Sequence, residues 1–417
     1  MEYLEKIFQG DDIMIKVAVL GYGTVGSGVV EVLDNNKDII ANRVGEEITV
    51  SHVLDLREFP GDRISEILVH DFEDILQDDE VKIVAEAMGG IEPAFTFAKK
   101  ALEQGKHFCT SNKELVAKHG AELIAFAKEN NVNFMFEASV GGGIPVIRGI
   151  NASLRQEKIV EIAGILNGTT NYMMTKMDNE GVDFDEVLKD AQDKGYAERN
   201  PEADVEGYDA CRKIAILSSL AYGKQVNFED IYTEGITKIS TTDMKYAKAM
   251  KKTIKLLGTS KVVDGEVSAM VAPFLVDRKS PLYAVNDVFN AILIKGNMLG
   301  DTMFYGAGAG KLPTASAVVA DIVDIACNLN KNVPIIWNKD KLELNKFDNI
   351  VSDFFVRVDN TDGKAKDNVF NAFEDIEEIE KIVDNEYAFI VRNMSEGDFK
   401  ALINKVNNVL SIIRIKG

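Results

Sequence analysis

Four ionisable residues near the middle of the chain are spaced so that they could act on one small substrate. They are Glu198, Asp204, Asp209 and Lys213. The apolar periodicity of residues 210–220 predicts a helix, so Asp209 and Lys213 should form an opposite-charge pair on one face. An exposed pair stabilises a helix by only about 0.2–0.5 kcal/mol, which does not explain the acids before it. A zwitterionic substrate does, because carboxylates bind its ammonium group and a lysine can protonate a carbonyl oxygen.

The size and charge of the chain exclude several classes of protein. It has 417 residues, 46% of them hydrophobic, enough for two or three domains of about 150 residues. A net charge of −20 argues against nucleic acid as a partner, since phosphate binding needs a positive patch. No uncharged apolar run reaches the roughly 18 residues of a membrane span, and the N-terminus lacks a signal-peptide pattern. We therefore expect a soluble, cytoplasmic protein without a membrane partner.

A glycine-rich segment near the N-terminus has the pattern of a dinucleotide-binding turn. The run from Ile15 to Leu20 predicts a strand, and a helical pattern starts at Ser27. Between them the first glycine permits the turn, the second lets the main chain approach a pyrophosphate, and the third allows close helix packing. The helix N-terminus then offers free N–H groups to the anion. The expected cofactor-binding residues are Gly21, Tyr22, Gly23, Thr24, Val25 and Gly26.

Two charged residues after the second predicted strand bear on the choice of cofactor. Asp55 follows the run 48–54 and could accept a hydrogen bond from the ribose 2′-hydroxyl of NAD. It comes later than the spacing of about 20 residues that is typical of this motif. Arg57 could instead accommodate the 2′-phosphate of NADP. These residues therefore do not decide between NAD and NADP as the cofactor.

Alternating strands and helices predict a Rossmann-type, doubly wound parallel sheet in a dinucleotide-binding domain at residues 1–150. Residues 1–13 could be an arm or a partial helix. Within this domain we expect a helix at 121–130 and a strand at 132–138. Ligands in such sheets lie at the carboxyl ends of the strands, where the loops 88–90, 110–113 and 139–145 follow.

The pattern changes after this domain. Strand candidates at 267–276 and 290–298 predict an α+β substrate and catalytic domain at 151–310, with a mostly antiparallel sheet. An apolar helix at 311–330 should return to complete the first domain. A linker at 331–350 precedes a ferredoxin-like βαββαβ unit at 351–417.

Several longer stretches resemble the homoserine dehydrogenase family. Besides GYGTVG at 21–26, they are SNKELVA at 111–117, EASVGGGIPVI at 137–147, GILNGTTNYM at 164–173, GYAERNPEADVEGYDACRKIAIL at 195–217 and YGAGAGKLPTASAVV at 305–319. They cover most of residues 14–329 in the expected order. The resemblance implies reversible, NAD(P)-dependent reduction of L-aspartate 4-semialdehyde to L-homoserine in threonine, methionine and isoleucine biosynthesis.

The resemblance also implies roles for individual residues. Lys213 and Lys113 would be the catalytic pair, with Lys213 the stronger candidate to protonate the oxygen and Lys113 also beside the cofactor. The expected substrate-binding residues are Glu198, Asp209, Asp204, Gly168, Thr169 and Tyr196. A sodium ion is implied at Glu137 and the main-chain carbonyls of Val140, Gly142 and Ile144. Gly308 lies in a second glycine cluster, which could be a hinge or a loop closing over the cofactor.

The C-terminal unit resembles the ACT domain that many family members carry. Its loop at 361–364 lacks the usual proline-glycine step, which leaves binding of an amino-acid effector such as threonine an open expectation. Family members usually dimerise through the substrate domain, so we expect a homodimer or homotetramer. Leu54 stands where many NADP-using members have arginine, which favours NAD.

Two other functions are alternative hypotheses to a homoserine dehydrogenase. A semialdehyde dehydrogenase would need a thiolate beside a base, and Cys109 is the single candidate thiol. A regulatory amino-acid sensor would keep its function in residues 351–417 and retain the dinucleotide domain as a vestige. The intact series from Glu198 to Lys213 argues against a vestige.

Overall fold

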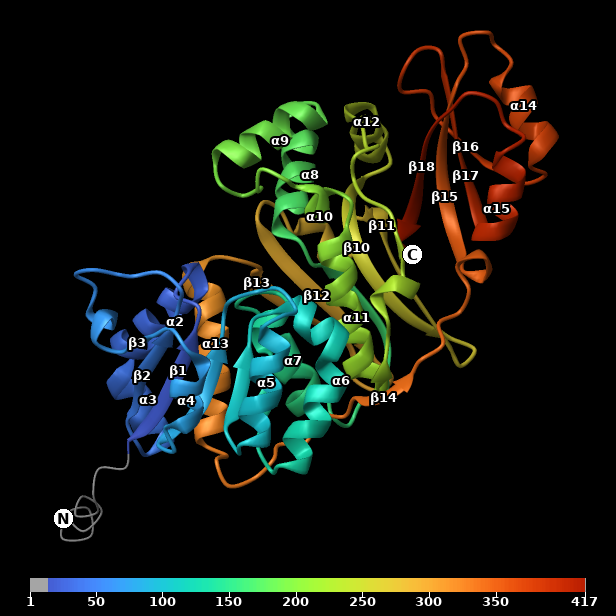
Figure 1. Cartoon of the computed structure of the whole chain (residues 1–417). Helices are drawn as coiled ribbons and strands as arrows, with labels where there is room; N and C mark the ends of the chain where they lie inside the picture. Colours follow the sequence, from blue (N-terminus) through green and yellow to red (C-terminus); the bar gives the residue numbers. More distant parts are fainter. Residues whose placement is uncertain (1–13, 417) are drawn as a thin grey trace, which may run out of the picture. The chain divides into compact units, whose positions relative to one another are not determined.

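The computed structural model describes residues 14–416, in two compact units (Figure 1). The first contains the described residues up to Gln156, together with Ser219–Gln225 and Ala307–Lys341. The second contains Glu157–Ser218, Val226–Gly306 and the described residues from Leu342 onward. The arm or partial helix expected at 1–13 lies outside the described residues.

A six-stranded parallel sheet forms the centre of the first unit, as predicted. Its order is β3-β2-β1-β4-β5-β6. The order in which successive strands are added reverses between β1 and β4, as is typical of doubly wound folds. The strands are rich in buried β-branched residues, which favour a sheet covered on both faces. Their bounds are β1 Ile15–Leu20, β2 Ile48–Leu54, β3 Leu68–Val69, β4 Val81–Glu86, β5 His107–Thr110 and β6 Phe134–Met135.

The helices of this unit include one that returns from late in the sequence. Helix α13 packs on α2 beside the sheet (Figure 1) and contributes Val318, Ile322 and Ile325 to its core. The helices are α2 Thr24–Asn35, α3 Lys37–Val44, α4 Phe72–Gln77, α5 Ala94–Glu103, α6 Lys113–Glu129, α7 Val146–Arg148 and α13 Lys311–Ala326. A short parallel pair, β8 (Lys224–Gln225) and β14 (Asn338–Lys341), also belongs here.

Two elements of this unit differ in extent from the prediction. Helix α6 begins at Lys113 instead of 121, because the Asn112 side chain caps it by accepting bonds from the N–H groups of Glu114 and Leu115. The strand expected at 132–138 is reduced to β6. After β6 the chain leaves the sheet in a 3-10 turn, Glu137–Ser139, where the Glu137 N–H donates to Asp321 at 2.8 Å.

The second unit is built on a ten-stranded mixed sheet. Its main order is β13-β12-β7-β10-β11-β18-β15-β17-β16, and β9 pairs with β11 outside this path. The strands that precede the C-terminal region in the sequence are β7 Ile159–Ile165, β9 Tyr232–Thr233, β10 Lys252–Val263, β11 Glu266–Asp277, β12 Phe289–Gly296 and β13 Gly300–Ala307. The helices are α8 Gly168–Glu180, α9 Phe184–Asp193, α10 Glu202–Val205, α11 Tyr208–Tyr222 and α12 Thr241–Ala249.

The C-terminal region has the expected βαββαβ order and continues the same sheet. Strand β18 pairs in parallel with β11, with Leu275 opposite Ile415. Helices α14 and α15 cover the C-terminal strands (Figure 1) over a separate core that includes Phe354, Phe389 and Phe399. The elements are β15 Val351–Asp359, α14 Ala365–Ala372, β16 Glu377–Ile379, β17 Glu386–Ser395, α15 Glu396–Ile403 and β18 Val409–Lys416.

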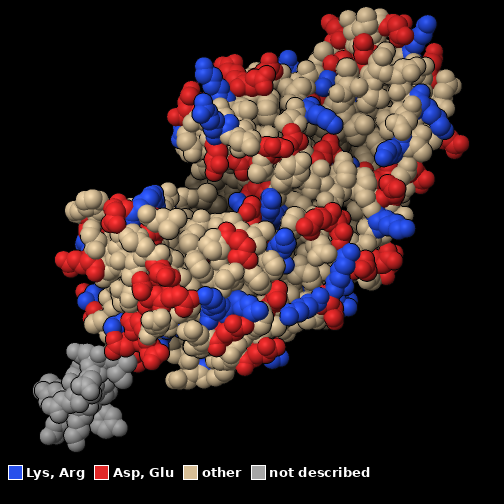
Figure 2. Space-filling view, in the orientation of Figure 1, with Lys and Arg blue, Asp and Glu red and all other residues tan. Residues whose placement is uncertain are grey.

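The surface mixes charges of both signs. On the face that Figure 2 shows, Lys and Arg side chains are scattered among Asp and Glu. Within residues 14–416, no helix is long and apolar enough to cross a membrane.

Candidate functional site

The glycine turn after β1 has the backbone that a pyrophosphate site needs. Gly21 has φ +89°, and a Cβ atom on Gly26 would lie 1.8 Å from the Gly21 carbonyl oxygen, so this approach requires glycine. Helix α2 starts at Thr24, followed by Val25, and its N-cap Gly23 has no side chain to occupy the terminal N–H groups. Those groups remain available to an anion at the positive end of the helix dipole. The turn therefore fits the phosphates of a dinucleotide.

Asp55 lies directly beside this turn and is paired with Arg57. One carboxylate oxygen accepts the Tyr22 N–H at 2.8 Å, and Arg57 donates to both oxygens at 2.8 and 2.9 Å. The hydrogen bonds from Arg57 hold the pKa of Asp55 well below its ordinary value. Because the Arg57 side chain is 61% exposed, it can leave the pair without breaking a packed core. The ribose end of the site therefore offers both a carboxylate and an exposed guanidinium.

A buried carboxylate, Glu86, organises the neighbouring loops at the same edge of the sheet. It accepts the N–H groups of Met88 and Gly89 at 2.7 and 3.0 Å, and the Thr110 hydroxyl donates to its other oxygen. Burial raises the pKa of Glu86, although these donors oppose the shift. Thr110 in turn accepts the Asn112 N–H at 2.8 Å. The network thus ties the loop after β4 to the loop after β5.

Lys113 is placed by this network. It is the half-buried first residue of α6, directly after the cap Asn112, whose side-chain amide also donates to the Gly90 carbonyl. The loop that contains Gly90 follows Met88, which would contact a Cβ atom on Gly21 at 3.0 Å. Lys113 and the glycine turn therefore share the carboxyl edge of the parallel sheet.

The second glycine cluster packs against another loop of the first unit. A Cβ atom on Gly142 would lie 2.6 Å from the Gly308 carbonyl group, and the Gly143 N–H donates to Ala307 at 3.1 Å. Gly308 itself is buried. This packing defines the position of the main chain around Gly308.

In the second unit, one asparagine joins the predicted acids. The Asn167 side-chain amide donates to Asp204 at 2.7 Å and to Asp209 at 2.9 Å, while its oxygen caps α8 by accepting the Thr170 N–H. Asn167 is only 6% exposed. It therefore holds two carboxylates together at the N-terminus of α8.

Lys213 completes this acid cluster. Its ammonium group donates to Asp209 at 2.7 Å and to the Leu166 carbonyl at 2.8 Å. The bond to Asp209 is the one expected from the spacing of four residues on α11. The side chains of Lys213 and Asp209 are 12% and 4% exposed, so the two residues form a largely buried ion pair and not a solvated surface pair. A largely desolvated ammonium with fixed acceptors has a defined direction for donating its remaining proton.

The other residues expected to bind substrate lie near the same helix end or in the loop after α9. Gly168 is the first residue of α8, and the Thr169 hydroxyl donates to the Tyr196 carbonyl at 2.6 Å. The Tyr196 ring is 45% exposed and packs edge-on against Tyr172. Glu198 is exposed, and its main-chain carbonyl accepts a bond from Gln192. The structure joins Thr169 to Tyr196 and does not bring Glu198 into the hydrogen-bonded acid cluster.

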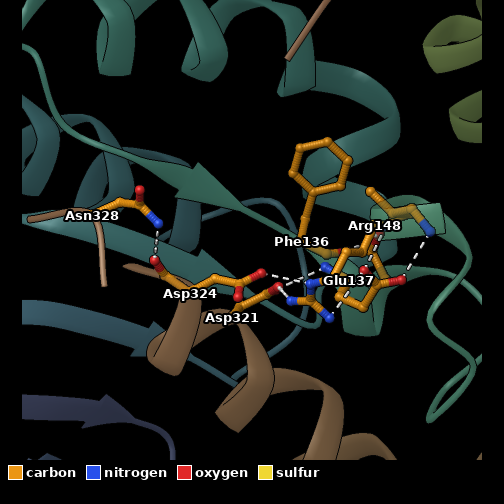
Figure 3. A network of polar contacts seen from close by, with 8 residues as sticks. Phe136, Glu137, Arg148, Asp321, Asp324 and Asn328 are labelled. Carbon is orange, nitrogen blue, oxygen red and sulfur yellow. Dashed lines mark hydrogen bonds and ion pairs between the residues drawn. The ribbon is translucent and has the colours of Figure 1, made fainter. Parts of the chain in front are cut away.

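Glu137 belongs to a buried charged network in the first unit (Figure 3). Its carboxylate accepts the N–H groups of Ile147 and Arg148 at 2.8 and 2.7 Å. Arg148 also pairs with Asp321 and Asp324, so one guanidinium serves three acids. Burial and the nearby Glu137 raise the pKa of Asp321 well above its ordinary value.

This network bears on the implied cation. Among residues 14–416, no group of three or more His, Cys, Asp or Glu side chains could hold a metal ion. The Glu137 carboxylate already accepts two N–H groups, and the Ile144 carbonyl accepts the Val146 N–H at 2.8 Å. A sodium site here would therefore depend mainly on main-chain oxygens.

Sequence reasoning missed three residues that organise the site: Glu86, Asn112 and Asn167. Asn112 and Asn167 both precede helix starts, and the N-cap preference of asparagine is a signal that could have found them. The alternative thiol mechanism loses its candidate, because Cys109 is fully buried and burial raises its pKa well above the ordinary value.

The chain is similar to several known proteins. Family models for the homoserine dehydrogenase NAD-binding domain and for homoserine dehydrogenase match residues 21–137 and 145–323. The homoserine dehydrogenase of Bacillus subtilis strain 168 is 42% identical over 322 residues, which cover 76% of this chain and 74% of that protein.

Solved structures extend the similarity to the C-terminal region. A homoserine dehydrogenase from Thiobacillus denitrificans superposes with a TM-score of 0.87 at 33% identity, over 97% of this chain and 98% of that one. A hyperthermophilic archaeal homoserine dehydrogenase in complex with NADPH has a TM-score of 0.66 at 26% identity, over 78% of this chain and 99% of that one. The chain belongs to the homoserine dehydrogenase family.

Proposed function

We propose that this protein, an NAD(P)-dependent oxidoreductase by family, interconverts L-aspartate 4-semialdehyde and L-homoserine with Lys213 as the proton donor to the substrate oxygen. The bound nicotinamide supplies or accepts the hydride. Hydride addition to the aldehyde carbon leaves an alkoxide, which needs a donor within about 3 Å. The observation that carries the proposal is the Lys213 ammonium, bonded to Asp209 and Leu166 and largely shielded from water.

The surrounding residues have complementary parts in this proposal. Asp209 and Asp204 hold the substrate ammonium and keep Lys213 oriented. Gly168 and Thr169 line the pocket at the N-terminus of α8, where N–H groups favour the substrate carboxylate. Tyr196 and the exposed Glu198 contact the substrate from the loop after α9. In the reverse direction, Lys213 receives the hydroxyl proton.

The first unit would bind the dinucleotide. The glycine turn holds the pyrophosphate, Lys113 lies at the nicotinamide end as the second catalytic lysine, and Gly308 contacts the cofactor. Asp55 favours NAD, and an Arg57 that leaves the carboxylate can pair with the 2′-phosphate of NADP. The match to the family's NAD-binding domain model and the NADPH complex of the archaeal relative together support use of either cofactor.

A monovalent cation is a further part of the proposal. Glu137 and the main-chain carbonyls of Val140, Gly142 and Ile144 would hold it. Glu137, Asp321 and Asp324 share the single guanidinium of Arg148, and a cation bound nearby would favour the ionised form of Asp321, whose pKa is raised by burial. Its part would be to stabilise the loop that packs on Gly308.

The C-terminal region is proposed to be ACT-like, with an amino-acid effector as its ligand, and the protein to be a homo-oligomer working in threonine, methionine and isoleucine biosynthesis. The βαββαβ order and the antiparallel pairing of β15 with β17 and β18 support the first of these.

The proposed reaction is tested by following homoserine oxidation with NAD and with NADP separately. We expect turnover in the wild type and a fall in kcat of about 100- to 10,000-fold in Lys213→Met, which is the contribution typical of general acid–base catalysis. The affinity for NAD(P)H should stay within a few-fold, since Lys213 is not among the cofactor-binding residues. Retained turnover in Lys213→Met would remove Lys213 from the mechanism.

A further inference from the structure

The two substrate acids flank a tight turn that depends on one short segment. Asp204 lies in α10 and Asp209 in α11, and the turn that joins the two helices runs from Val205, the last residue of α10, through Gly207. The Ile236 N–H donates to the Val205 carbonyl at 2.8 Å. A Cβ atom on Gly235 would lie 2.1 Å from that carbonyl oxygen, so residues 234–236 press directly on the turn.

The same segment is fixed on its other side by the sheet. The Glu234 N–H donates to the Val271 carbonyl at 2.8 Å, and β9, which ends at Thr233, pairs in parallel with β11. Gly207 lies against Thr233 and Val271, where a Cβ atom would contact both side chains at 3.2 Å. The position of the turn therefore follows the position of residues 233–236.

The last strand of the chain holds this segment through a buried ion pair. Arg414 of β18 donates to Glu234 at 2.7 Å and to Glu396 at 2.6 and 2.9 Å. The Arg414 side chain is only 6% exposed and lies over the Tyr232 ring, whose hydroxyl also donates to Glu234. A buried guanidinium with fixed partners resists displacement, because moving it would leave charges unpaired.

We propose that Glu234 and Arg414 are positioning residues for the substrate, which hold the turn so that Asp204 and Asp209 keep the spacing that binds the substrate ammonium. The C-terminal region thereby influences substrate affinity through the contact of Arg414 with Glu234, independently of any effector. This inference rests on the proposed function. It predicts an effect on the homoserine KM, because the acids bind substrate, and little effect on kcat, because Lys213 keeps its bonds to Asp209 and Leu166.

The chain offers a matched control in a second buried arginine. Arg357 of β15 is 5% exposed and also pairs with two acids, the buried Asp243 of α12 and the less buried Glu386. Glu386 is the more exposed of the two acids that pair with Arg357, as Glu234 is for Arg414. The side chain of Glu386 is 13% exposed and that of Glu234 is 25% exposed. The side-chain hydrogen bonds and ion pairs of Arg357 and Glu386 go to Asp243, to Ser240 and to each other, and not to residues 205–207 or 234–236.

The test compares Glu234→Ala with Glu386→Ala in the full-length protein. We expect similar decreases in Tm, but a rise of about fivefold or more in the homoserine KM for Glu234→Ala alone, with kcat and the NAD(P) KM within twofold. Glu234→Gln, which keeps one hydrogen bond to Arg414, should lie between Glu234→Ala and the wild type. An unchanged KM in Glu234→Ala, or an equal rise in both alanine variants, would overturn the proposal.

Hydrogen exchange of residues 202–210 and of the Ile236 amide provides a readout that does not depend on the reaction. Exchange should accelerate in Glu234→Ala and stay at the wild-type rate in Glu386→Ala. If wild-type protein fails to oxidise homoserine, the proposed function fails, and the exchange data alone then decide whether Glu234 holds the turn. Equal exchange in all three proteins refutes the positioning role.

Discussion

Asn167→Asp is the substitution that most directly tests the acid cluster. The amide of Asn167 donates to Asp204 at 2.7 Å and to Asp209 at 2.9 Å. Aspartate has nearly the same shape and still caps α8, but it has no N–H group to donate and adds a third carboxylate. The variant therefore changes the charge of the cluster while it leaves the helix start intact.

The magnitude follows from the two lost bonds. A hydrogen bond to a charged group contributes about 1.5–3 kcal/mol, so losing both weakens the cluster by about 3–6 kcal/mol. At 1.36 kcal/mol per tenfold in rate, kcat/KM for homoserine should fall by at least about 100-fold. Repulsion between three close carboxylates adds to the loss and also disturbs Asp209, the partner of Lys213.

Steady-state kinetics with homoserine is the appropriate assay, with Asn167→Ser as the matched control. Serine also caps a helix but neither bridges the two acids nor adds charge, so its kcat/KM should fall less than that of Asn167→Asp. Both variants should keep a Tm within a few degrees of each other. If Asn167→Asp retains wild-type kcat/KM, the argument that Asn167 holds the acids together for catalysis is refuted.

Two further predictions concern the implied cation and a buried lysine. Replacing sodium by tetramethylammonium should lower activity if carbonyls near Gly142 hold a cation, and activity indifferent to the exchange would argue against the site. Burial lowers the pKa of Lys255 from 10.5 to about 8, so the unfolded chain binds more protons than the folded one between these values and stability should rise with pH there. Relative to Lys255→Met, the unfolding free energy of the wild type should increase by about 2 kcal/mol from pH 7.5 to 10 in urea titrations, and parallel curves for the two proteins would contradict the shifted pKa.

The C-terminal region acquires a structural explanation that does not require a ligand. Its last strand pairs with β11 of the same sheet, and two buried arginines, Arg357 and Arg414, pair with Asp243 and Glu234 from earlier in the sequence. Truncation of residues 351–417 would therefore expose a sheet edge and leave Asp243 and Glu234 without their partners.

The sequence by itself determined the elements whose signals are local. The GxGxxG turn was predicted because its strand, glycines and helix are contiguous, and the Asp209–Lys213 pair because four residues span about one helical turn. The βαββαβ order of the last region followed from the same short-range periodicity. The extent of α6 and β6 was predicted less well, because a cap at Asn112 and contacts of Glu137 with the distant Asp321 override local propensity.

Only the tertiary structure decided which residues from distant segments meet. Asn167 reaches Asp204 and Asp209 across a helix pair, and Arg414 reaches Glu234 over a separation of 180 residues. The burial of Glu86 likewise depends on helices packed on both faces of its sheet. Periodicity along a chain indicates which face of an element is apolar, but it carries no information on which polar group of another element will satisfy a buried charge. That pairing is set by the packing of the whole unit.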